Sequence, residues 1–225
     1  MIYAITTLMI GEDIKIDYPR YRAFVGWPEG WDILSAMQFR CLTFLGLREY
    51  HYLLDIGCGS LRTGRLLIPY LLPGHYFGIE PEQWLIKEGI KKECGKGLIK
   101  IKKPIFSNDR NFTCTQFGQE FDFILAHSIF THAPQSQIRR CISEVKKCMK
   151  PTGIFMATFL KGDNDYLGSE WSYPDCVEYT VETMKKTVGE FELMCNPVEW
   201  YHRNQTLILI TFPGAKIEIP EAIPK

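Results

Sequence analysis

The chain has 225 residues, a length that suits one sizeable α/β domain and is short for two. Hydrophobic residues make up 46% of the chain and charged residues 23%, the composition of an ordinary globular protein. Lys and Arg together number 26, as do Asp and Glu, so the balanced charge argues against a partner held mainly by electrostatics, such as nucleic acid or an anionic membrane.

The N-terminal segment and the cysteines are typical of a cytoplasmic protein. The first ten residues are apolar, but they have no basic region or small-residue cleavage site and are too short to span a bilayer. We expect a strand or a packed arm there. The eight cysteines form no Cys-x-x-Cys pair, and Cys141 and Cys148 share one face of a predicted helix. We therefore expect reduced, buried cysteines rather than disulfides or a zinc site.

From residue 48 onward, short apolar runs alternate with stretches of helical periodicity. The apolar runs predict strands at residues 52–56, 76–80, 121–127, 154–160, 191–199 and 205–212, with one more inside 98–107. The periodic stretches predict helices from about Asp32, at 61–72 with a bend or end at Pro69, from Pro81 to about 94, from Pro134 to 149 and at 179–188. The lysine-rich stretch 87–103 is the one candidate for a basic patch, although a solvated helix face is the preferred interpretation.

Strands that alternate with helices predict a single-domain, Rossmann-like α/β fold with a mostly parallel, seven-stranded sheet and helices on both faces. The short connection between the last two strands predicts a C-terminal antiparallel hairpin. Ligands of such sheets bind at the carboxyl ends of the strands. One crevice should therefore be surrounded by residues 55–60, Glu80, residues 127–132 and the segment after Leu160.

The glycine turn after the first strand decides the ligand class. Residues 52–64 read YLLDIGCGSLRTG. The dinucleotide fingerprint needs a third glycine where Arg62 stands, and a phosphate-binding loop needs a Gly-Lys-Ser/Thr sequence that is absent. Neither phosphate interpretation fits.

Asp55, preceded by apolar residues and followed by Ile-Gly-x-Gly, resembles the first motif of class I S-adenosylmethionine-dependent methyltransferases. The stretches FDFILAHSIFTHAP and VKKCMKPTGIFMATF resemble this family's fourth strand with its loop, and its next helix, turn and fifth strand, so the resemblance covers roughly residues 38–212. It implies the methyltransferase fold and S-adenosyl-L-methionine as cofactor. The cofactor-binding residues that it implies are Asp55, Gly57, Cys58, Gly59, Glu80, Gln38, Ala126 and His127.

Physical reasons support two of these roles. A glycine has no Cβ, so Gly57 and Gly59 let the backbone approach the methionine part of the cofactor. Two carboxylate oxygens can accept hydrogen bonds from a vicinal diol, so Glu80 suits the ribose hydroxyls. Leu61 departs from the small residue that is frequent in this turn, and it leaves open a non-catalytic member of the family.

Residues 1–47 are expected to form an N-terminal arm and a lid helix, and residues 48–225 the cofactor-binding domain. Family members often use such a helix as a lid over the cofactor. Gln38, Trp27 and Phe39 are then candidate wall residues, with Trp27 also a candidate for the acceptor site. Trp27 and Phe39 as plain core residues are the alternative.

The loop after the fourth strand offers candidate general bases. An imidazole titrates near neutrality, so His132 or His127 could take the proton of an acceptor hydroxyl, and we prefer His132 because it precedes a helix start. A structural role is the alternative for each histidine. Segment 161–176 and the hairpin offer candidate acceptor-binding side chains, some of them aromatic: Tyr166, Trp171, Tyr173 and His202. The alternative is that these side chains only hold a surface loop in place.

Absent motifs narrow the reaction. Residues 127–130 read His-Ser-Ile-Phe where base-amino methyltransferases carry Asp/Asn-Pro-Pro-aromatic, and no nucleophilic cysteine stands nearby. Ala126 and His127 occupy the place where magnesium-dependent O-methyltransferases begin their carboxylate set, and Asp163 with Asp165 could not form a metal cage alone. We therefore expect no metal.

The expected function is methyl transfer from S-adenosylmethionine to a small-molecule acceptor, an oxygen nucleophile of a metabolite or a sugar-like compound. The alternatives are an RNA or protein methyltransferase that uses the lysine-rich stretch, and a non-catalytic interaction protein of the same fold. Neither nucleic acid nor membrane is an expected partner. A monomer and a homodimer are equally compatible with the sequence.

Overall fold

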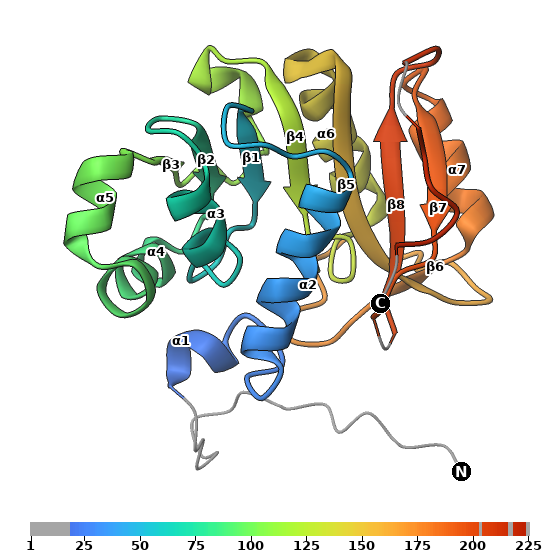
Figure 1. Ribbon diagram of the computed structural model, residues 1–225. Helices are drawn as coiled ribbons and strands as arrows, with labels where there is room; N and C mark the ends of the chain where they lie inside the picture. The colour runs from blue at the N-terminus through green and yellow to red at the C-terminus, as the bar shows by residue number, and fades with distance from the viewer. Residues whose placement is uncertain (1–18, 203, 216–217, 224–225) are drawn as a thin grey trace.

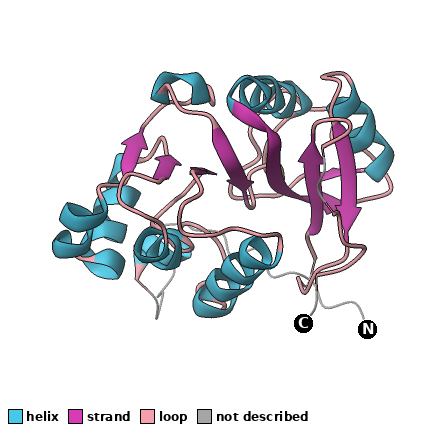
Figure 2. Ribbon diagram, turned by 45° about the horizontal axis from the view of Figure 1, so that its top comes forward, coloured by secondary structure: helices cyan, strands magenta, loops and turns pink. Residues whose placement is uncertain are grey.

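A computed structural model of the chain describes residues 19–202, 204–215 and 218–223 (Figure 1). The strand or packed arm expected at residues 1–10 lies outside these residues. Figure 2 shows the sheet between two layers of helices.

The described residues form one sheet of eight strands with the order β3-β2-β1-β4-β5-β8-β7, and β6 pairs with β5 off this path. All pairings are parallel except those of β8 with β5 and with β7. The predicted mostly parallel sheet with a C-terminal antiparallel hairpin is therefore confirmed. The strands are β1 (Leu53–Ile56), β2 (Tyr76–Ile79), β3 (Ile105–Ser107), β4 (Phe121–Ala126), β5 (Met149–Lys161), β6 (Glu178–Tyr179), β7 (Met194–Val198) and β8 (Thr206–Thr211).

Helices cover both faces of this sheet. One face packs against α6 and α7, and the other packs against α2, α3 and α4. In Figure 1, α2 lies across the sheet face nearest the viewer, and α6 lies behind the sheet. The helices are α1 (Arg20–Ala23), α2 (Trp31–Phe44), α3 (Gly64–Tyr70), α4 (Gln83–Gly89), a π-helix η1 (Ile90–Cys94), α5 (Lys96–Lys102), a 3-10 helix η2 (Cys114–Phe117), α6 (Gln135–Cys148) and α7 (Val181–Gly189).

Alternation along β1 creates the two cores. Leu53 belongs to the core beneath α2 and α3, whereas Leu54 and Ile56 belong to the core beneath α6 and α7. Successive side chains of a strand point to opposite faces, so a strand covered on both faces must be apolar throughout. Asp55 breaks this apolar run at a buried position.

Several predicted boundaries are wrong for local reasons. Pro81 does not lie in the first turn of α4, because that helix begins at Gln83 after the N-cap Glu82. Most of the stretch 98–107 is helical, and only its last three residues form β3. β5 begins at Met149, since residues 150–153 continue the strand instead of only ending α6. Tyr179 belongs to β6, and α7 starts after Thr180, whose side chain caps it by accepting from the Thr183 N–H.

The structure also places two proline-linked helix boundaries and the cysteines. α3 ends one residue after Pro69, and α6 begins after Pro134. Cys141 and Cys148 are both buried, and all eight cysteines, which lie within the described residues, are free thiols. Within the described ranges, no helix is long and apolar enough to cross a membrane, and no cluster of three metal-ligating side chains occurs.

Candidate cofactor and acceptor site

The glycine turn follows β1, and its two glycines adopt backbone conformations that residues with a side chain rarely adopt. Gly57 and Gly59 have φ of +68° and +54°. A Cβ on Gly57 would lie 2.1 Å from Ile129 Cδ1, and a Cβ on Gly59 would lie 2.8 Å from Val25 Cγ1. The missing Cβ atoms therefore permit Ile129 and Val25 to approach the turn closely. Leu61 also adopts a positive φ, of 63°.

Glu80 follows β2 and faces the glycine turn. Its Oε2 accepts a hydrogen bond from the Gly59 N–H at 3.0 Å, and its Oε1 accepts from the Glu82 N–H at 2.8 Å. The side chain is buried, which raises the pKa of Glu80, while the two backbone N–H groups act to lower it. The carboxylate thus stands beside the turn.

Asp55 and Cys58 form the inner layer of the turn. Asp55 accepts a hydrogen bond from the Tyr76 hydroxyl at 2.8 Å, and burial raises the pKa of Asp55 to about 7. Burial also raises the pKa of the Cys58 thiol well above its usual value, so this thiol is protonated near neutrality. The Cys58 N–H donates to the Ile79 carbonyl at 3.1 Å, which ties the turn to β2.

Gln38 and Ala126 flank the turn from a helix and a strand. Gln38 projects from α2, and its Oε1 accepts from the Thr63 hydroxyl at 2.6 Å. Its Nε2 is buried and has no hydrogen-bond partner among the described residues. Ala126 is the buried last residue of β4.

Arg62 and His127 form a buried pair that the sequence did not predict. Arg62 Nη2 lies 3.0 Å from His127 Nδ1. A guanidinium can only donate, so Nδ1 accepts and the proton of the neutral ring is on Nε2. Burial, with the nearby Arg62 charge, lowers the pKa of His127 well below its usual value, so the ring is neutral.

His202 lies beside this pair. Its ring centroid is 5.7 Å from that of His127, and it stacks on Trp200 at 5.2 Å with an interplanar angle of 13°. His202 Nδ1 accepts from the Gln205 N–H at 3.0 Å, and burial lowers the pKa of His202 to about 4. The hairpin therefore brings a second neutral imidazole to the carboxyl end of β4.

His132 lies on the same loop and is hydrogen-bonded differently. Its Nδ1 is 2.7 Å from the Asp175 carbonyl oxygen, which can only accept, so Nδ1 carries a proton and, in the neutral ring, Nε2 has the lone pair. The ring is half-buried and packs edge-on against Tyr173, with 5.4 Å between the ring centroids. Segment 161–176 thus orients His132.

The other predicted acceptor residues are spread over this end of the sheet. The Tyr173 hydroxyl donates to the Phe24 carbonyl at 2.6 Å, and the Tyr166 hydroxyl donates to the Glu170 carbonyl at 3.0 Å. Trp171 lies 6.4 Å from Phe112 between ring centroids. Trp171 and Trp27 are both exposed. The structure therefore joins Tyr173 to His132, whereas Tyr166 bonds to Glu170 and Trp171 packs near Phe112.

Residues 19–30, which we call the N-terminal strap, belong to the segment expected as an N-terminal arm and lid helix, but the sequence did not predict their contacts with the turn. The Ser60 hydroxyl donates to the Tyr21 carbonyl at 2.7 Å, and Arg62 Nη1 donates to the Val25 carbonyl at 3.1 Å. Contacts between residues 37 and 39 positions apart leave no local pattern in a sequence. The only sequence signal for these contacts was Arg62, which stands where the dinucleotide fingerprint has a glycine.

The residues at the turn fit an S-adenosylmethionine molecule chemically. The glycine backbones, the Glu80 carboxylate and the unpartnered Gln38 Nε2 offer the acceptors, donors and space that the resemblance implies. Val25 and Ile129 lie against the two glycines, so both side chains must shift before a ligand can touch that backbone.

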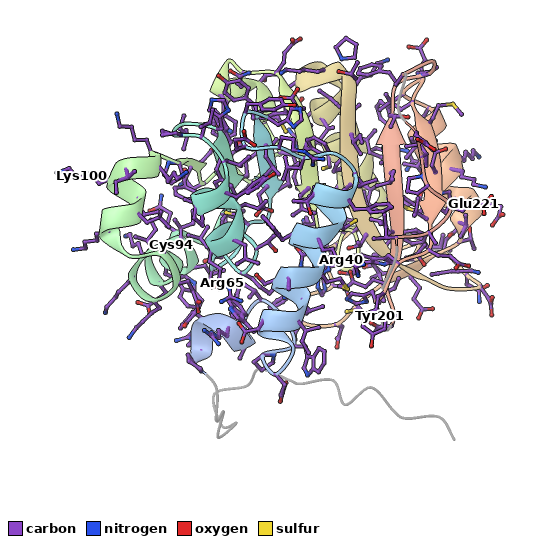
Figure 3. The ribbon with its side chains drawn as sticks, viewed as in Figure 1. Arg40, Arg65, Cys94, Lys100, Tyr201 and Glu221 are labelled. Atoms are coloured by element: carbon purple, nitrogen blue, oxygen red, sulfur yellow. The ribbon has the colours of Figure 1, made fainter. Side chains whose placement is uncertain are left out.

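Two grooves lie outside this turn. One of about 540 Å³, between α1 and α4, is lined by Pro19, Arg20, Tyr21, Trp84, Lys87, Glu88 and Lys92. A smaller one of about 140 Å³ is lined by Ala36, Met37, Arg40, Trp200, Tyr201 and Ile223, of which Figure 3 labels Arg40 and Tyr201.

Comparisons with known proteins agree with the fold. Residues 54–155 match the family model of a methyltransferase domain. A crystal structure of an S-adenosylmethionine-dependent methyltransferase from Clostridium acetobutylicum ATCC 824 has a TM-score of 0.60 at 13% identity, covering 83% of this chain and 92% of that chain. The comparison with curated protein sequences gives no significant match.

Two further solved structures have named substrates. Magnesium protoporphyrin IX methyltransferase from Synechocystis PCC 6803, with bound S-adenosylhomocysteine, has a TM-score of 0.60 at 12% identity and covers 82% of this chain and 84% of that one. The glycopeptide N-methyltransferase MtfA, complexed with S-adenosylmethionine, has a TM-score of 0.62 at 7% identity and covers 80% and 94%. At these identities the likeness concerns the fold.

Residues 54–155 match a methyltransferase domain, and the strand order with the glycine turn after β1 gives the chain the fold of S-adenosylmethionine-dependent methyltransferases. S-adenosylmethionine is the methyl donor of this class.

Proposed function

We propose that the chain transfers the methyl group of S-adenosylmethionine to a small-molecule acceptor, and that the acceptor atom is the oxygen of a metabolite or a sugar-like compound. The observation that carries this proposal is the hydrogen bonding of His132, which leaves Nε2 able to accept a proton at the carboxyl end of β4. Two of the similar structures are of enzymes named for a porphyrin and a glycopeptide, and both named substrates are compatible with an acceptor that is not a nucleic acid or a protein.

The donor would be held by the turn and the end of β2. Gly57 and Gly59 allow its amino-acid half to meet the backbone, and Glu80 supplies two acceptor oxygens for the ribose hydroxyls. Gln38, Asp55, Cys58 and Ala126 complete the wall of this side. The donor supplies an electrophilic methyl group, so the protein contributes proximity, orientation and the exclusion of water.

The acceptor would lie beside His132. With Nδ1 held by the Asp175 carbonyl, Nε2 is the atom that takes the proton of an acceptor hydroxyl. Tyr173 packs on the ring and fixes its orientation, and Tyr166, Trp171, Trp27 and His202 are the further proposed acceptor contacts. His127 fits a different role, because its Nδ1 already accepts from Arg62 and its Nε2 can only donate.

The cofactor assignment is tested by Glu80→Ala. Loss of the carboxylate removes the proposed ribose contact, so the affinity for S-adenosylhomocysteine measured by calorimetry should fall at least about tenfold. Glu82→Ala is the matched control, since this neighbouring side chain pairs with Arg110 and should bind like the parent. Equal affinity of the parent and Glu80→Ala would contradict the site.

The catalytic assignment is tested by His132→Asn. In a screen of metabolite extracts with methyl-labelled S-adenosylmethionine, we expect labelled product from the parent and a loss of about 100-fold or more in rate from the variant. Binding of S-adenosylhomocysteine should be unchanged, because His132 is assigned to the acceptor side. His75→Asn, which alters a half-buried histidine that stacks on Tyr52 near Tyr50, is the control. An active His132→Asn enzyme would remove His132 as the base.

A further inference from the structure

Arg62 is a buried cation without a carboxylate partner among the described residues. Its exposed fraction is 9%, and the described hydrogen bonds of its guanidinium run to the Val25 carbonyl and to His127 Nδ1. Its Nε is buried without a partner. A guanidinium carries five N–H donors and stays charged, and a desolvated charge that meets only neutral acceptors is costly.

Arg65, three residues further along the chain, differs from Arg62 because it pairs with a carboxylate. Arg65 Nη2 lies 2.6 Å from Asp32 Oδ1, and Figure 3 labels this side chain beside α2. Arg22 and Arg139 likewise pair with carboxylates of the chain. Arg62 is the more buried side chain, and nothing in the described chain neutralises it by direct contact.

The guanidinium lies next to the glycine turn, and Val25 connects the two. The Val25 carbonyl oxygen accepts from Arg62 Nη1 at 3.1 Å, while Val25 Cγ1 lies 2.8 Å from the position of a Cβ on Gly59. Val25 therefore contacts both the glycine turn and the Arg62 guanidinium.

The neighbours of Arg62 are also donors. His127 carries its proton on Nε2, which is buried and unpartnered in the described chain. Gln38 Nε2 is buried and unpartnered as well, while its Oε1 is bonded to Thr63, the residue after Arg62. Arg62 Nε, His127 Nε2 and Gln38 Nε2 are thus three buried donors without a partner among the described residues, and the charge of Asp55, which lies near Arg62, is not in hydrogen-bonding contact with it. An anion is a ligand that satisfies such donors.

We propose that Arg62 binds the carboxylate at the amino-acid end of the methyl donor, with His127 and Gln38 as supporting donors. The inference rests on the proposed function, since it assigns one end of the same ligand. A planar guanidinium matches a carboxylate with two parallel hydrogen bonds, which a lysine cannot reproduce. The Val25 carbonyl is the acceptor that the ligand carboxylate would replace.

Two probes isolate this contact. S-adenosylhomocysteine carries the amino-acid end, whereas 5′-methylthioadenosine keeps the adenosine and the thioether sulfur but has no carboxylate. Binding of both to the full chain is measured by calorimetry for the parent, Arg62→Gln and the control Arg65→Gln. We expect Arg62→Gln to bind S-adenosylhomocysteine at least about tenfold more weakly and 5′-methylthioadenosine within about twofold of the parent. Arg65→Gln should match the parent for both.

Each remaining outcome counts for or against the proposal. If Arg62→Gln does not fold, Arg62→Lys keeps the charge but loses the fork, and a selective loss of S-adenosylhomocysteine affinity supports the proposal. Equal losses for both probes, or no loss, overturn it while leaving the cofactor site intact. A parent that binds neither probe removes the proposed function and this inference together.

Discussion

Asp55 is a carboxyl group inside a fully buried strand. It accepts from the Tyr76 hydroxyl and lies close enough to Arg62 for that charge to lower its pKa, yet burial dominates and raises the pKa to about 7. The unfolded value is about 3.9. Between these two values the folded chain holds a proton that the unfolded chain releases, so this residue makes stability fall as pH rises.

The Asp55→Asn variant should remove that dependence. From about pH 4.5 to about pH 8, its free energy of unfolding should rise relative to the parent, by at most roughly 4 kcal/mol. His127 and His202 act in the opposite direction, because burial lowers the pKa of both and stability is lost as pH falls. They are unchanged in the variant, so the difference between the two proteins isolates Asp55.

Urea unfolding at several pH values measures this difference. Asp32→Asn, which changes an exposed carboxylate on α2, is measured alongside as the control for the loss of a surface carboxylate. A constant difference between the parent and Asp55→Asn across the range would show that Asp55 is ionised in the folded protein throughout.

At the scale of elements, the N-terminal strap is fixed by one buried carboxylate. Glu93, in the π-helix η1, accepts from the Tyr21 hydroxyl at 2.8 Å and from Arg22 Nη2 at 2.7 Å. Its side chain is only 5% exposed. The wider π-helical turn replaces the expected end of a regular helix at Cys94, and π-turns are frequent at functional sites. The strap that holds Val25 over Gly59 is therefore anchored from the far side of α4.

The elements that sequence reasoning found share one property, a strong local period. α6 has a buried apolar position every three to four residues, and β4 is apolar except for Asp122. In the stretch 98–107, Ile99-Lys100-Ile101-Lys102 alternates with the period of two that is typical of a strand, yet these residues lie in α5, and the left-handed Lys103 separates α5 from β3. The local alternation therefore could not distinguish the helix from the short edge strand that follows it.

The candidate site likewise has some residues that the sequence predicts and some contacts that it does not. The glycine turn and Glu80 could be predicted because motif and strand order fix them, and the structure places Glu80 against Gly59. The pairing of Arg62 with His127 joins residues 65 positions apart, and the tautomers of His127 and His132 depend on single contacts. These features follow from tertiary packing, which a single sequence does not encode in any local spacing.

At the scale of the whole molecule, two cores share one sheet. Leu53 and Leu54 are neighbours in β1 with exposed fractions of 0%, yet they belong to the cores on opposite faces. β1 pairs with both β2 and β4, so it lies in the interior of the sheet. Loss of either core should therefore release the strands on which the other core depends.

Leu53→Ala and Leu54→Ala test this coupling. Each substitution opens a cavity in a different core and should lower the free energy of unfolding by about 3 kcal/mol. In both variants the far-UV circular dichroism and tryptophan fluorescence transitions should coincide, because the molecule unfolds as one unit. Leu167→Ala, at a position with an exposed fraction of 92%, should stay within about 0.5 kcal/mol of the parent. Separate transitions in either core variant would mean that the two faces of the sheet unfold independently, and that β1 does not couple the helix layer over the cofactor turn to the layer behind it.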